Sequence, residues 1–453
     1  AENEDECKKQ AKEFYSKDVE LKRDEDVLDT WFSSGLWPFA TLGWPEKTPE
    51  VEKFYPTSVL VTGFDIIFFW VARMIMMGTE FLKDEPFKNI YVHALVRDEK
   101  GQKMSKSKGN VIDPLELIEK YSADALRFTL LSMASPGRDV KLSEDRVKGN
   151  RNFLNKIWNA NNFLRQNECN FSDVKKPENL KLTINKWILS ELVKTKNETE
   201  NSLKNYRFDE AAKNIYQFVW HSFCDWYLEL SKTVFNSNNK EEIKELRQTS
   251  SYVFREILII LHPFIPFVTE EIWLNNKLDK NGGEFLMHAN WLEGDYHEKK
   301  SYDEINNIIN FITSIRSFKN ELNISPGSFI EISTENTNKE YKNFLSSNEN
   351  IMKKNGRIKN FHEKDLDKPS ASIVISGELF KLYFDEDVDL NMIKSTLEKK
   401  ITKISEEMKK IDVRLSNKSF VDRAPQNIVE QEKSNFANLE KDVKKIELTL
   451  KGL

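Results

Sequence analysis

One stretch in the first third of the chain decides the interpretation: Gly101-Gln102-Lys103-Met104-Ser105-Lys106-Ser107-Lys108-Gly109-Asn110. Two glycines make this stretch flexible, and its lysines and serines supply ammonium and hydroxyl groups. Such a loop can wrap a triphosphate and stabilise the charge that builds up during phosphoryl or nucleotidyl transfer. On composition alone, a solvated basic loop is an equally open interpretation.

The segments on either side of the loop have the pattern of an α/β domain. Short β-branched runs predict strands at Val59–Thr62 and Asn89–Val96. Between them, the apolar run 64–81 predicts a mostly buried helix. After the loop, an Asp-Pro pair predicts a helix over 113–130, because Asp is a favoured N-cap and Pro a favoured first helical residue. Strand, helix, strand, loop and helix in this order are typical of an α/β fold.

The middle of the chain has a different pattern of apolar residues. Aromatic and aliphatic residues recur at helical spacing over residues 146–299 and predict an α-helical bundle. Residues 300–388 are mixed, with strands predicted at Phe329–Ser333, Ala371–Ile375 and Leu379–Phe384. We therefore expect a small α/β connector after the bundle.

The end of the chain has the most regular pattern. Apolar residues from Ile393 to Leu415 are separated by 4, 4, 3, 4, 3 and 4, and those from Phe436 to Leu450 by 3, 4, 3 and 4. Two seams of near-heptad period joined by a short break predict an antiparallel coiled-coil hairpin. From Asn391 onwards there are 14 basic and 10 acidic residues, whereas the whole chain has a net charge of −5. A basic tail suggests contact with a polyanion, and a solvated helix face explains the charge equally well.

Composition excludes several classes of protein. The chain has 453 residues, of which 39% are apolar and 31% charged, so it is too apolar for a disordered chain. No apolar stretch approaches the roughly 20 clean residues of a membrane span, and no secretory leader is visible. Three widely spaced cysteines exclude a disulfide framework and a Cys-rich zinc site. We expect a cytoplasmic protein without a membrane partner.

The loop carries a family resemblance. Lys103-Met104-Ser105-Lys106-Ser107 resembles the Lys-Met-Ser-Lys-Ser signature of the class I aminoacyl-tRNA synthetases, and it has the expected strand before it and capped helix after it. The resemblance implies that these five residues bind ATP and that Lys103 and Lys106 are catalytic, with Lys106 contacting the phosphates. It also implies Mg²⁺ bound with ATP, and no metal site made by the protein is expected.

Further segments narrow the resemblance to the valyl-tRNA synthetases. The similar segments are Asp29–Ser34, Leu42–Pro45, Thr62–Ile66 and Trp70–Met74. The resemblance implies that Trp31, Asp65 and Ile66 help to form a valine pocket. An indole wall and a branched side chain suit a small β-branched ligand, and a carboxylate can receive its ammonium group. For Trp31, an ordinary core tryptophan is the alternative.

The second half of the chain agrees with this resemblance. Phe223–Glu229 and Leu261–Phe267 are similar to the anticodon-binding bundle of the Ile, Leu, Val and Met group, and most of these residues are expected in the core. A C-terminal coiled-coil arm is typical of the valyl enzymes, in which it braces the outer corner of the tRNA. The candidate RNA contacts, each of which could equally solvate a helix face, are Lys399, Lys400, Lys403, Lys409, Lys410, Lys444 and Lys445.

Two features of the resembled enzymes are missing from this sequence. It contains no His-Ile-Gly-His signature, and it does not contain the editing insertion. We therefore expect an α/β plus all-α chain that corresponds to the C-terminal portion of such an enzyme. The expected parts are a remnant before the catalytic re-entry (1–25), the second half of a Rossmann-type catalytic domain (26–145), the anticodon-binding bundle (146–299), the connector (300–388) and the coiled-coil arm (389–453).

The expected function is that of a valine–tRNA ligase fragment. The parent enzyme would activate valine with ATP and transfer it to tRNA(Val), acting as a monomer, and the isolated fragment is expected to be inactive. Three alternatives stay open: a non-catalytic half-protein that binds tRNA, a sister synthetase for isoleucine, and a protein-interaction module that uses the coiled coil.

Overall fold

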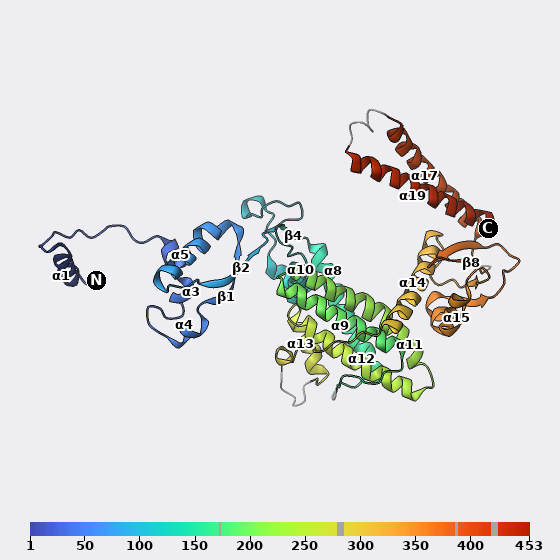
Figure 1. The fold of residues 1–453 in the computed structure, drawn as a ribbon, viewed down its shortest axis with the longest axis horizontal. Helices are drawn as coiled ribbons and strands as arrows, with labels where there is room; N and C mark the ends of the chain where they lie inside the picture. The colour runs from blue at the N-terminus through green and yellow to red at the C-terminus, as the bar shows by residue number, and fades with distance from the viewer. Residues whose placement is uncertain (172–173, 279–284, 386–387, 418–424) are drawn as a thin grey trace. The chain divides into compact units, whose positions relative to one another are not determined.

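The computed structural model describes residues 1–171, 174–278, 285–385, 388–417 and 425–453, without the side chains of residues 106, 442, 445 and 448 (Figure 1). The described chain forms two compact units. The first contains Ala1–Glu116, Leu130–Arg146 and Leu203–Asp209, and the second contains Leu117–Thr129, Val147–Ser202 and Glu210–Leu453.

The first unit is built on a two-stranded parallel sheet. Its strands are β1 (Thr57–Gly63) and β2 (Phe87–His93). Helix α5 (Ala72–Phe81) lies between them in the chain, so the segment is a β-α-β crossover. A small core of Val71, Met74 and Phe87 holds the helix on the sheet. The unit's other helices are α1 (Glu4–Tyr15), α2 (Thr30–Gly35), α3 (Trp37–Ala40) and α4 (Pro49–Phe54).

The apolar run 64–81 is not the mostly buried helix that its composition predicts. It consists of a 3-10 turn (η1, Phe64–Ile66), a π-helical turn (η2, Ile67–Val71) and α5. Phe68 is 78% exposed and Met76 is 67% exposed. A sheet of two strands offers too little surface to cover every side of this run. The prediction of burial is therefore wrong for the described unit, and an apolar face remains in contact with solvent.

The helix predicted over 113–130 is two helices, α6 (Pro114–Tyr121) and α7 (Ala123–Ser132). Ser122 separates them with a φ of 98°, a conformation that no α-helix contains. Its hydroxyl then accepts a hydrogen bond from the backbone N–H of Ala125 at 3.3 Å. Serine thus ends one helix and caps the next, which apolar periodicity does not reveal. The start is as predicted, because Asp113 accepts from the N–H of Leu115 at 2.8 Å.

The second unit begins with a helical bundle. A buried network centred on Tyr227 lies in it, where the hydroxyl of Tyr227 donates to Asn185 at 2.8 Å. Buried Asp124 accepts hydrogen bonds from the backbone N–H groups of Phe267 and Val268 and so ties α7 to the start of α13 (Pro266–Asn275). The bundle comprises α8 (Glu144–Gln166), α9 (Thr183–Lys204), α10 (Phe208–Tyr216), the π-helix η4 (Gln217–Tyr227), α11 (Leu228–Phe235), α12 (Lys240–Leu261) and α13 (Pro266–Asn275).

A small α/β layer follows the bundle. After α14 (Lys299–Glu321), a four-stranded sheet has the order β6-β5-β8-β7, with β5 parallel to β6 and antiparallel to β8. Its strands are β5 (Ile330–Ser333), β6 (Ile358–His362), β7 (Ala371–Ile375) and β8 (Glu378–Phe384), and its helices are α15 (Lys339–Ser347) and α16 (Glu349–Gly356). The three strands that the sequence predicts are present, and β6 is an addition.

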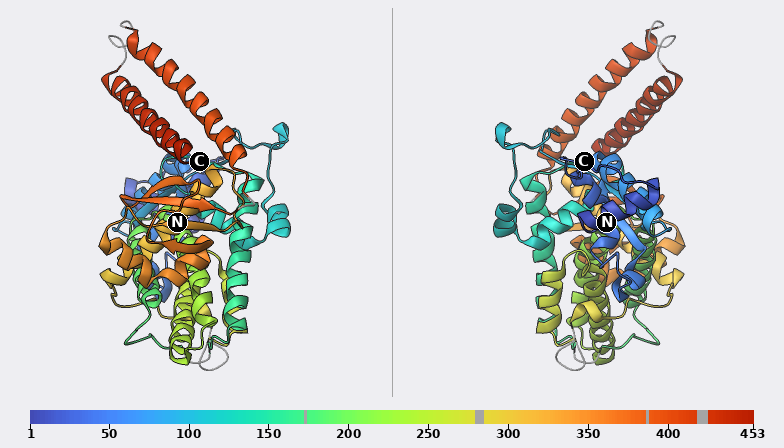
Figure 2. Two further views of the ribbon diagram at one scale, coloured as in Figure 1. Left: turned by 90° about the vertical axis from the view of Figure 1, so that its right-hand side faces the viewer. Right: turned by 90° about the vertical axis from the view of Figure 1, so that its left-hand side faces the viewer.

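Two 27-residue helices, α17 (Leu390–Ser416) and α19 (Gln426–Gly452), end the chain and lie side by side (Figures 1 and 2). Their root is anchored in the connector, because Ile393 and Ile446 pack with Leu322, which directly follows α14. The backbone oxygen of Gly452 also accepts from Ser370 at 2.8 Å. In the part of the chain that the structure describes, no helix combines the length and apolar character needed to cross a membrane.

Candidate nucleotide loop, amino-acid pocket and RNA contacts

A tight turn opens the candidate nucleotide loop. It follows β3 (Val96–Arg97), which pairs in parallel with β4 (Val140–Lys141). The carboxylate of Asp98 accepts from the N–H of Gln102 at 2.7 Å, and the backbone oxygen of Asp98 accepts from Gly101 at 2.9 Å. Gly101 has a φ of 81° here, which side-chain-bearing residues rarely adopt. The turn therefore needs both the aspartate and the glycine.

Asn110 closes the loop from its far end. Its Nδ2 donates to the carboxylate of Asp98 at 2.9 Å and to the backbone oxygen of Lys103 at 3.3 Å. Its Oδ1 accepts from the N–H of Ser105 at 3.0 Å. The hydrogen bond from Asn110, followed by that from the Gln102 backbone, lowers the pKa of Asp98. One amide thus fixes the backbone of the signature residues.

The apex of the loop presents basic and hydroxyl groups. A 3-10 turn covers Lys106–Lys108, and the hydroxyls of Ser105 and Ser107 are 3.2 Å apart. Lys103 and Lys108 are exposed, and neither forms an ion pair with another described residue. Met104 is half-buried, and the side chain of Lys106 lies outside the described part of the structure. The described donors suit the oxygens of a triphosphate.

A metal ion has no evident protein site. In residues 1–171, 174–278, 285–385, 388–417 and 425–453, no group of three or more His, Cys, Asp or Glu side chains is placed to hold one. Mg²⁺ commonly binds through substrate phosphates and water rather than in an all-protein cage.

Trp31, one of the three predicted pocket residues, lies at the start of α2. Asp29 caps this helix by accepting from the N–H of Trp31 at 3.0 Å, and its other oxygen lies 3.2 Å from Nη1 of Arg73. The indole of Trp31 is half-buried, and its ring centroid lies 5.8 Å from that of Phe69. Trp31 is therefore partly exposed in this unit and not a fully enclosed core residue.

Asp65 and Ile66, the other two, lie in η1 directly after β1. This is the carboxyl end of a parallel strand, where ligands usually bind in α/β sheets. Asp65 is exposed and Ile66 half-buried. No hydrogen bond, ion pair or ring contact among the described residues joins either of them to Trp31. The three residues belong to one unit, and the described contacts do not close them into a pocket.

The predicted RNA contacts lie on the two terminal helices. Lys399, Lys403, Lys409 and Lys410 of α17 are exposed, and the side chain of Lys445 on α19 lies outside the described residues. Lys400 pairs with Glu321 at 3.0 Å, and Lys444 pairs with Glu440 at 3.0 Å. Two of the seven candidate cations thus already have carboxylate partners.

Sequence reasoning missed Asp98 and Asn110, although both shape the loop. Their side chains meet across twelve positions of sequence, a pairing that no helix or strand period encodes. The available signals were the turn predicted at Asp98–Gly101, which the structure confirms, and the turn-forming pair Gly109-Asn110 at the end of the signature.

Comparison with known proteins identifies the class. The family described as "tRNA synthetases class I (I, L, M and V)" matches residues 1–143, "Anticodon-binding domain of tRNA ligase" matches 185–334, and "Valyl tRNA synthetase tRNA binding arm" matches 389–453. Over most of its length the chain is thus similar to the class I aminoacyl-tRNA synthetases of this group.

The curated relatives that match the chain are valine–tRNA ligases. A "Valine--tRNA ligase" of Pelagibacter ubique (strain HTCC1062) is 66% identical over 451 residues, which cover 100% of this chain and 52% of the relative. One of Bartonella quintana (strain Toulouse) is 45% identical over 454 residues, or 100% of this chain and 50% of the relative. The chain thus spans about half the length of these valine–tRNA ligases and corresponds to their C-terminal half.

Among solved structures, the ternary complex titled "Agrobacterium radiobacter K84 agnB2 LeuRS-tRNA-LeuAMS" aligns with a TM-score of 0.49 at 17% identity. The alignment covers 69% of this chain and 36% of that chain.

Proposed function

We propose that this chain supplies the C-terminal half of a valine–tRNA ligase. In the proposed reaction, the carboxylate of valine attacks the α-phosphorus of ATP, forms valyl-adenylate and releases pyrophosphate. A terminal hydroxyl of tRNA(Val) then attacks the carbonyl carbon and releases AMP. The observation that carries the proposal is the 66% identity to a valine–tRNA ligase over the whole of this chain.

The proposed role of the loop is to hold ATP while pyrophosphate leaves. Lys103 and Lys106 would neutralise phosphate charge as it builds up, and Met104, Ser105 and Ser107 would complete the binding surface. Exposure of Lys103 and the absence of an ion pair to it among described residues support this role, because its ammonium group is available. The hydrogen bonds of Asn110 support it too, because they hold the loop backbone in place beforehand.

For the amino acid, we propose that Trp31 and Ile66 form apolar walls and that Asp65 receives the ammonium group. The position of Asp65 and Ile66 at the carboxyl end of β1 supports this assignment. The rest of the pocket would come from the half of the enzyme that this chain does not span. Mg²⁺ would enter with ATP and help to neutralise its phosphates.

For the tRNA, we propose that the bundle contacts the anticodon region and that α17 and α19 form an antiparallel coiled-coil arm along its outer corner. The seam residues Ile393, Leu397, Ile411 and Ile446 are buried, and Arg414 near the end of α17 pairs with Glu432 near the start of α19. The proposed parts are then 1–25, 26–145, 146–299, 300–388 and 389–453, in a monomeric, cytoplasmic enzyme.

A chimaera tests the proposal. This chain would replace the matching half of the Pelagibacter ligase, and ATP–pyrophosphate exchange would be measured with valine, isoleucine and no amino acid. We expect exchange that depends on valine and is much weaker with isoleucine. A folded chimaera without exchange would leave the chain as a tRNA-binding protein without catalytic function, and a preference for isoleucine would move it to the sister enzyme.

A further inference from the structure

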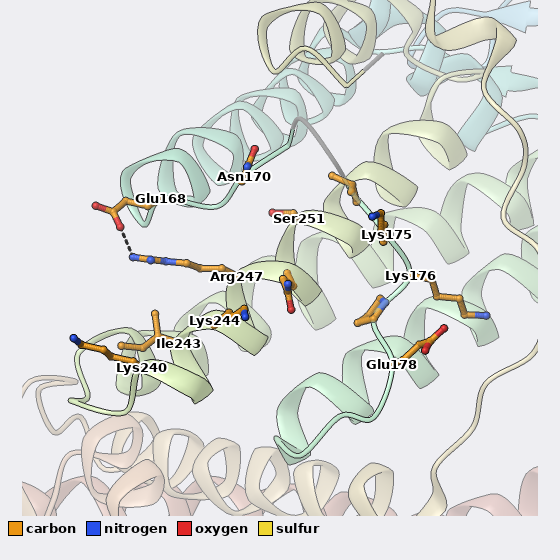
Figure 3. Close-up of a pocket in the computed structure, with 13 residues that line it drawn as sticks. Glu168, Asn170, Lys175, Lys176, Glu178, Lys240, Ile243, Lys244, Arg247 and Ser251 are labelled. Carbon is orange, nitrogen blue, oxygen red and sulfur yellow. Dashed lines mark hydrogen bonds and ion pairs between the residues drawn. The ribbon is translucent and has the colours of Figure 1, made fainter. Parts of the chain in front are cut away.

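A groove lined with positive charge lies on the helical bundle of the second unit (Figure 3). Its walls are Glu168 and Asn170 just after the end of α8, the connection 174–178, and α12 from Lys240 to Ser251. Its volume is about 930 Å³, large enough for several ligand groups. None of the residues that the sequence analysis singled out lines it.

The lining has a marked excess of basic over acidic residues. It contains two carboxylates, Glu168 and Glu178, and five cations: Lys175, Lys176, Lys240, Lys244 and Arg247. The whole chain carries a net charge of −5, so this is a local basic patch on an acidic protein. Such a patch attracts anions at short range, where salt does not yet screen it.

Not all five cations are available to a ligand. Arg247 is fixed, because its Nε donates to the backbone oxygen of Asn167 at 2.8 Å and its Nη2 lies 2.6 Å from Glu168 (Figure 3). Lys176 extends away from Lys244 in the same view. Arg247 therefore serves as a rigid wall, and the mobile charge of the groove comes from other residues.

Lys240 and Lys244 supply that mobile charge. They stand four positions apart on α12, which places them on one helix face about 6 Å apart along the axis. Both are exposed, and neither has an ion-pair partner among the described residues. The nearby Glu245 forms no ion pair with either lysine among the described residues, and its two oxygens accept from the N–H groups of Lys181 and Leu182 at 2.9 Å each.

The lining also indicates what kind of contact is made. Its described residues include no aromatic ring on which a base could stack. Ammonium groups spaced along a helix suit phosphates along a strand, and such contacts do not read sequence.

We propose that this groove binds the phosphate backbone of an RNA strand through Lys240 and Lys244. The proposal rests on the tRNA binding proposed above and adds a contact on the bundle that is distinct from the terminal arm. It also assigns Arg247 a positioning role, since its contacts to Asn167 and Glu168 hold the wall against which the strand would lie.

The first test compares two double variants of the 453-residue chain, K240Q/K244Q and K213Q/K339Q. Glutamine removes the charge and keeps the high helix propensity of lysine. Lys213 and Lys339 are exposed, lie outside the groove and have no ion pair among described residues, so the control removes the same charge. Affinity for a tRNA(Val) transcript would be measured between about 50 and 200 mM salt, where phosphate contacts dominate the dependence.

We expect K240Q/K244Q to reduce the slope of log affinity against log salt by about 1.4–1.8, or 0.7–0.9 for each lost phosphate contact. The control pair should change it much less. Equal changes in the salt slope for the two double variants would overturn the proposed RNA contact in the groove. The proposed binding of tRNA by the chain would still stand. If the unaltered chain failed to bind the transcript, the proposed function and this inference would fall together.

Lysine labelling gives a second readout that needs no variant. The chain would be acetylated with and without the tRNA transcript, and the modification of each lysine measured by mass spectrometry. Protection of Lys240 and Lys244, with Lys213 and Lys339 unprotected, is the expected result. Unchanged labelling of Lys240 and Lys244 in a complex that demonstrably forms would overturn the proposal.

Discussion

At the scale of single residues, the amide of Asn110 organises the candidate ATP loop. It reaches the carboxylate of Asp98, the backbone oxygen of Lys103 and the N–H of Ser105. None of these three groups is a side chain of the family signature, Lys103–Ser107. The lysines can act on phosphates only if the backbone that carries them is held, so Asn110 is the residue on which loop geometry depends.

Replacing Asn110 with alanine should therefore loosen the loop without unfolding the unit. The pKa of Asp98, which hydrogen bonds hold below its ordinary value of 3.8, should move back toward that value. Because the pKa of Asp98 is lowered, the hydrogen bonds that its carboxylate accepts from Asn110 and Gln102 stabilise the loop fully above pH 3.8. This stabilisation is lost as the pH falls through the lowered pKa. Carboxyl NMR of Asp98 in the parent and the variant would measure this pKa shift. An unchanged pKa would mean that Asn110 does not hold the Asp98 carboxylate.

A second residue-scale prediction concerns Lys319, which is 3% exposed and donates to the backbone oxygens of Ser328 and Gly356 at 2.8 and 3.3 Å. Burial, together with the charges of Arg357 and Arg316, lowers the pKa of Lys319 to about 8. Between that pKa and the ordinary 10.5, the unfolded chain binds more protons, so Lys319 makes stability rise with pH.

Lys319→Met should remove this dependence. From pH 7 to pH 10, the free energy of unfolding of the parent should gain up to about 3 kcal/mol relative to the variant. Urea unfolding at several pH values would show it. Parallel curves for the two proteins would mean that Lys319 does not change its protonation on unfolding.

At the scale of elements, the two-stranded sheet of β1 and β2 leaves apolar side chains in water. Val61 of β1 is 59% exposed, Ile90 of β2 is 44% exposed, and Phe68 of η2 is 78% exposed. A patch of this kind marks an interaction surface or an aggregation liability. Because the chain spans about half of its relatives' length, the other half of the enzyme is the expected cover.

Phe68→Ser should then behave differently in two contexts. In the 453-residue chain it should change the free energy of unfolding by less than about 0.5 kcal/mol, since the ring is already in water. In the chimaera with the Pelagibacter half it should cost about 1–3 kcal/mol, because a covered ring would be lost. Denaturant titration would compare the parent with the Phe68→Ser variant, once in the 453-residue chain and once in the chimaera. Equal losses of unfolding free energy in the two contexts would mean that Phe68 stays uncovered.

The terminal helices carry another element-scale prediction. Lys403 and Lys410 stand seven positions apart on α17 and are both exposed. The double change to glutamine should reduce the salt slope of tRNA binding by about 1.4–1.8. K213Q/K339Q again serves as the charge-matched control. Substitution is preferable to deletion of 389–453, which would also strip Ile393 and Ile446 from their cluster with Leu322. An unaltered slope would make the hairpin a structural arm only.

These elements also show what the sequence can and cannot predict. The helices of the terminal hairpin were predictable because Ile393, Leu397 and Ile411 repeat at helical spacing, and the helices and the burial are confirmed. The break at Ser122 was not, because one residue with positive φ leaves no periodic trace. The exposure of Phe68 was missed because the apolar character of a residue indicates only that it favours burial. It does not show whether this chain contains the surface that would bury it.

At the scale of the whole molecule, functional groups are divided between two units. The candidate nucleotide loop and the proposed pocket residues Trp31, Asp65 and Ile66 belong to the first unit, and the bundle, groove and terminal helices belong to the second. The proposed reaction needs both, since the first would activate valine and the second would hold the tRNA that receives it. Neither unit is expected to produce valyl-tRNA by itself.

Formation of valyl-tRNA by the chimaera is the most direct test of the central claim, because it requires loop, pocket, bundle and arm together. We predict that the chimaera charges tRNA(Val) with radiolabelled valine, and that Lys106→Ala abolishes charging while tRNA affinity is retained. The Lys213→Gln chimaera, measured in parallel, should charge normally. A folded chimaera that binds tRNA(Val) and forms no valyl-tRNA would contradict the assignment of this chain as the C-terminal half of a valine–tRNA ligase.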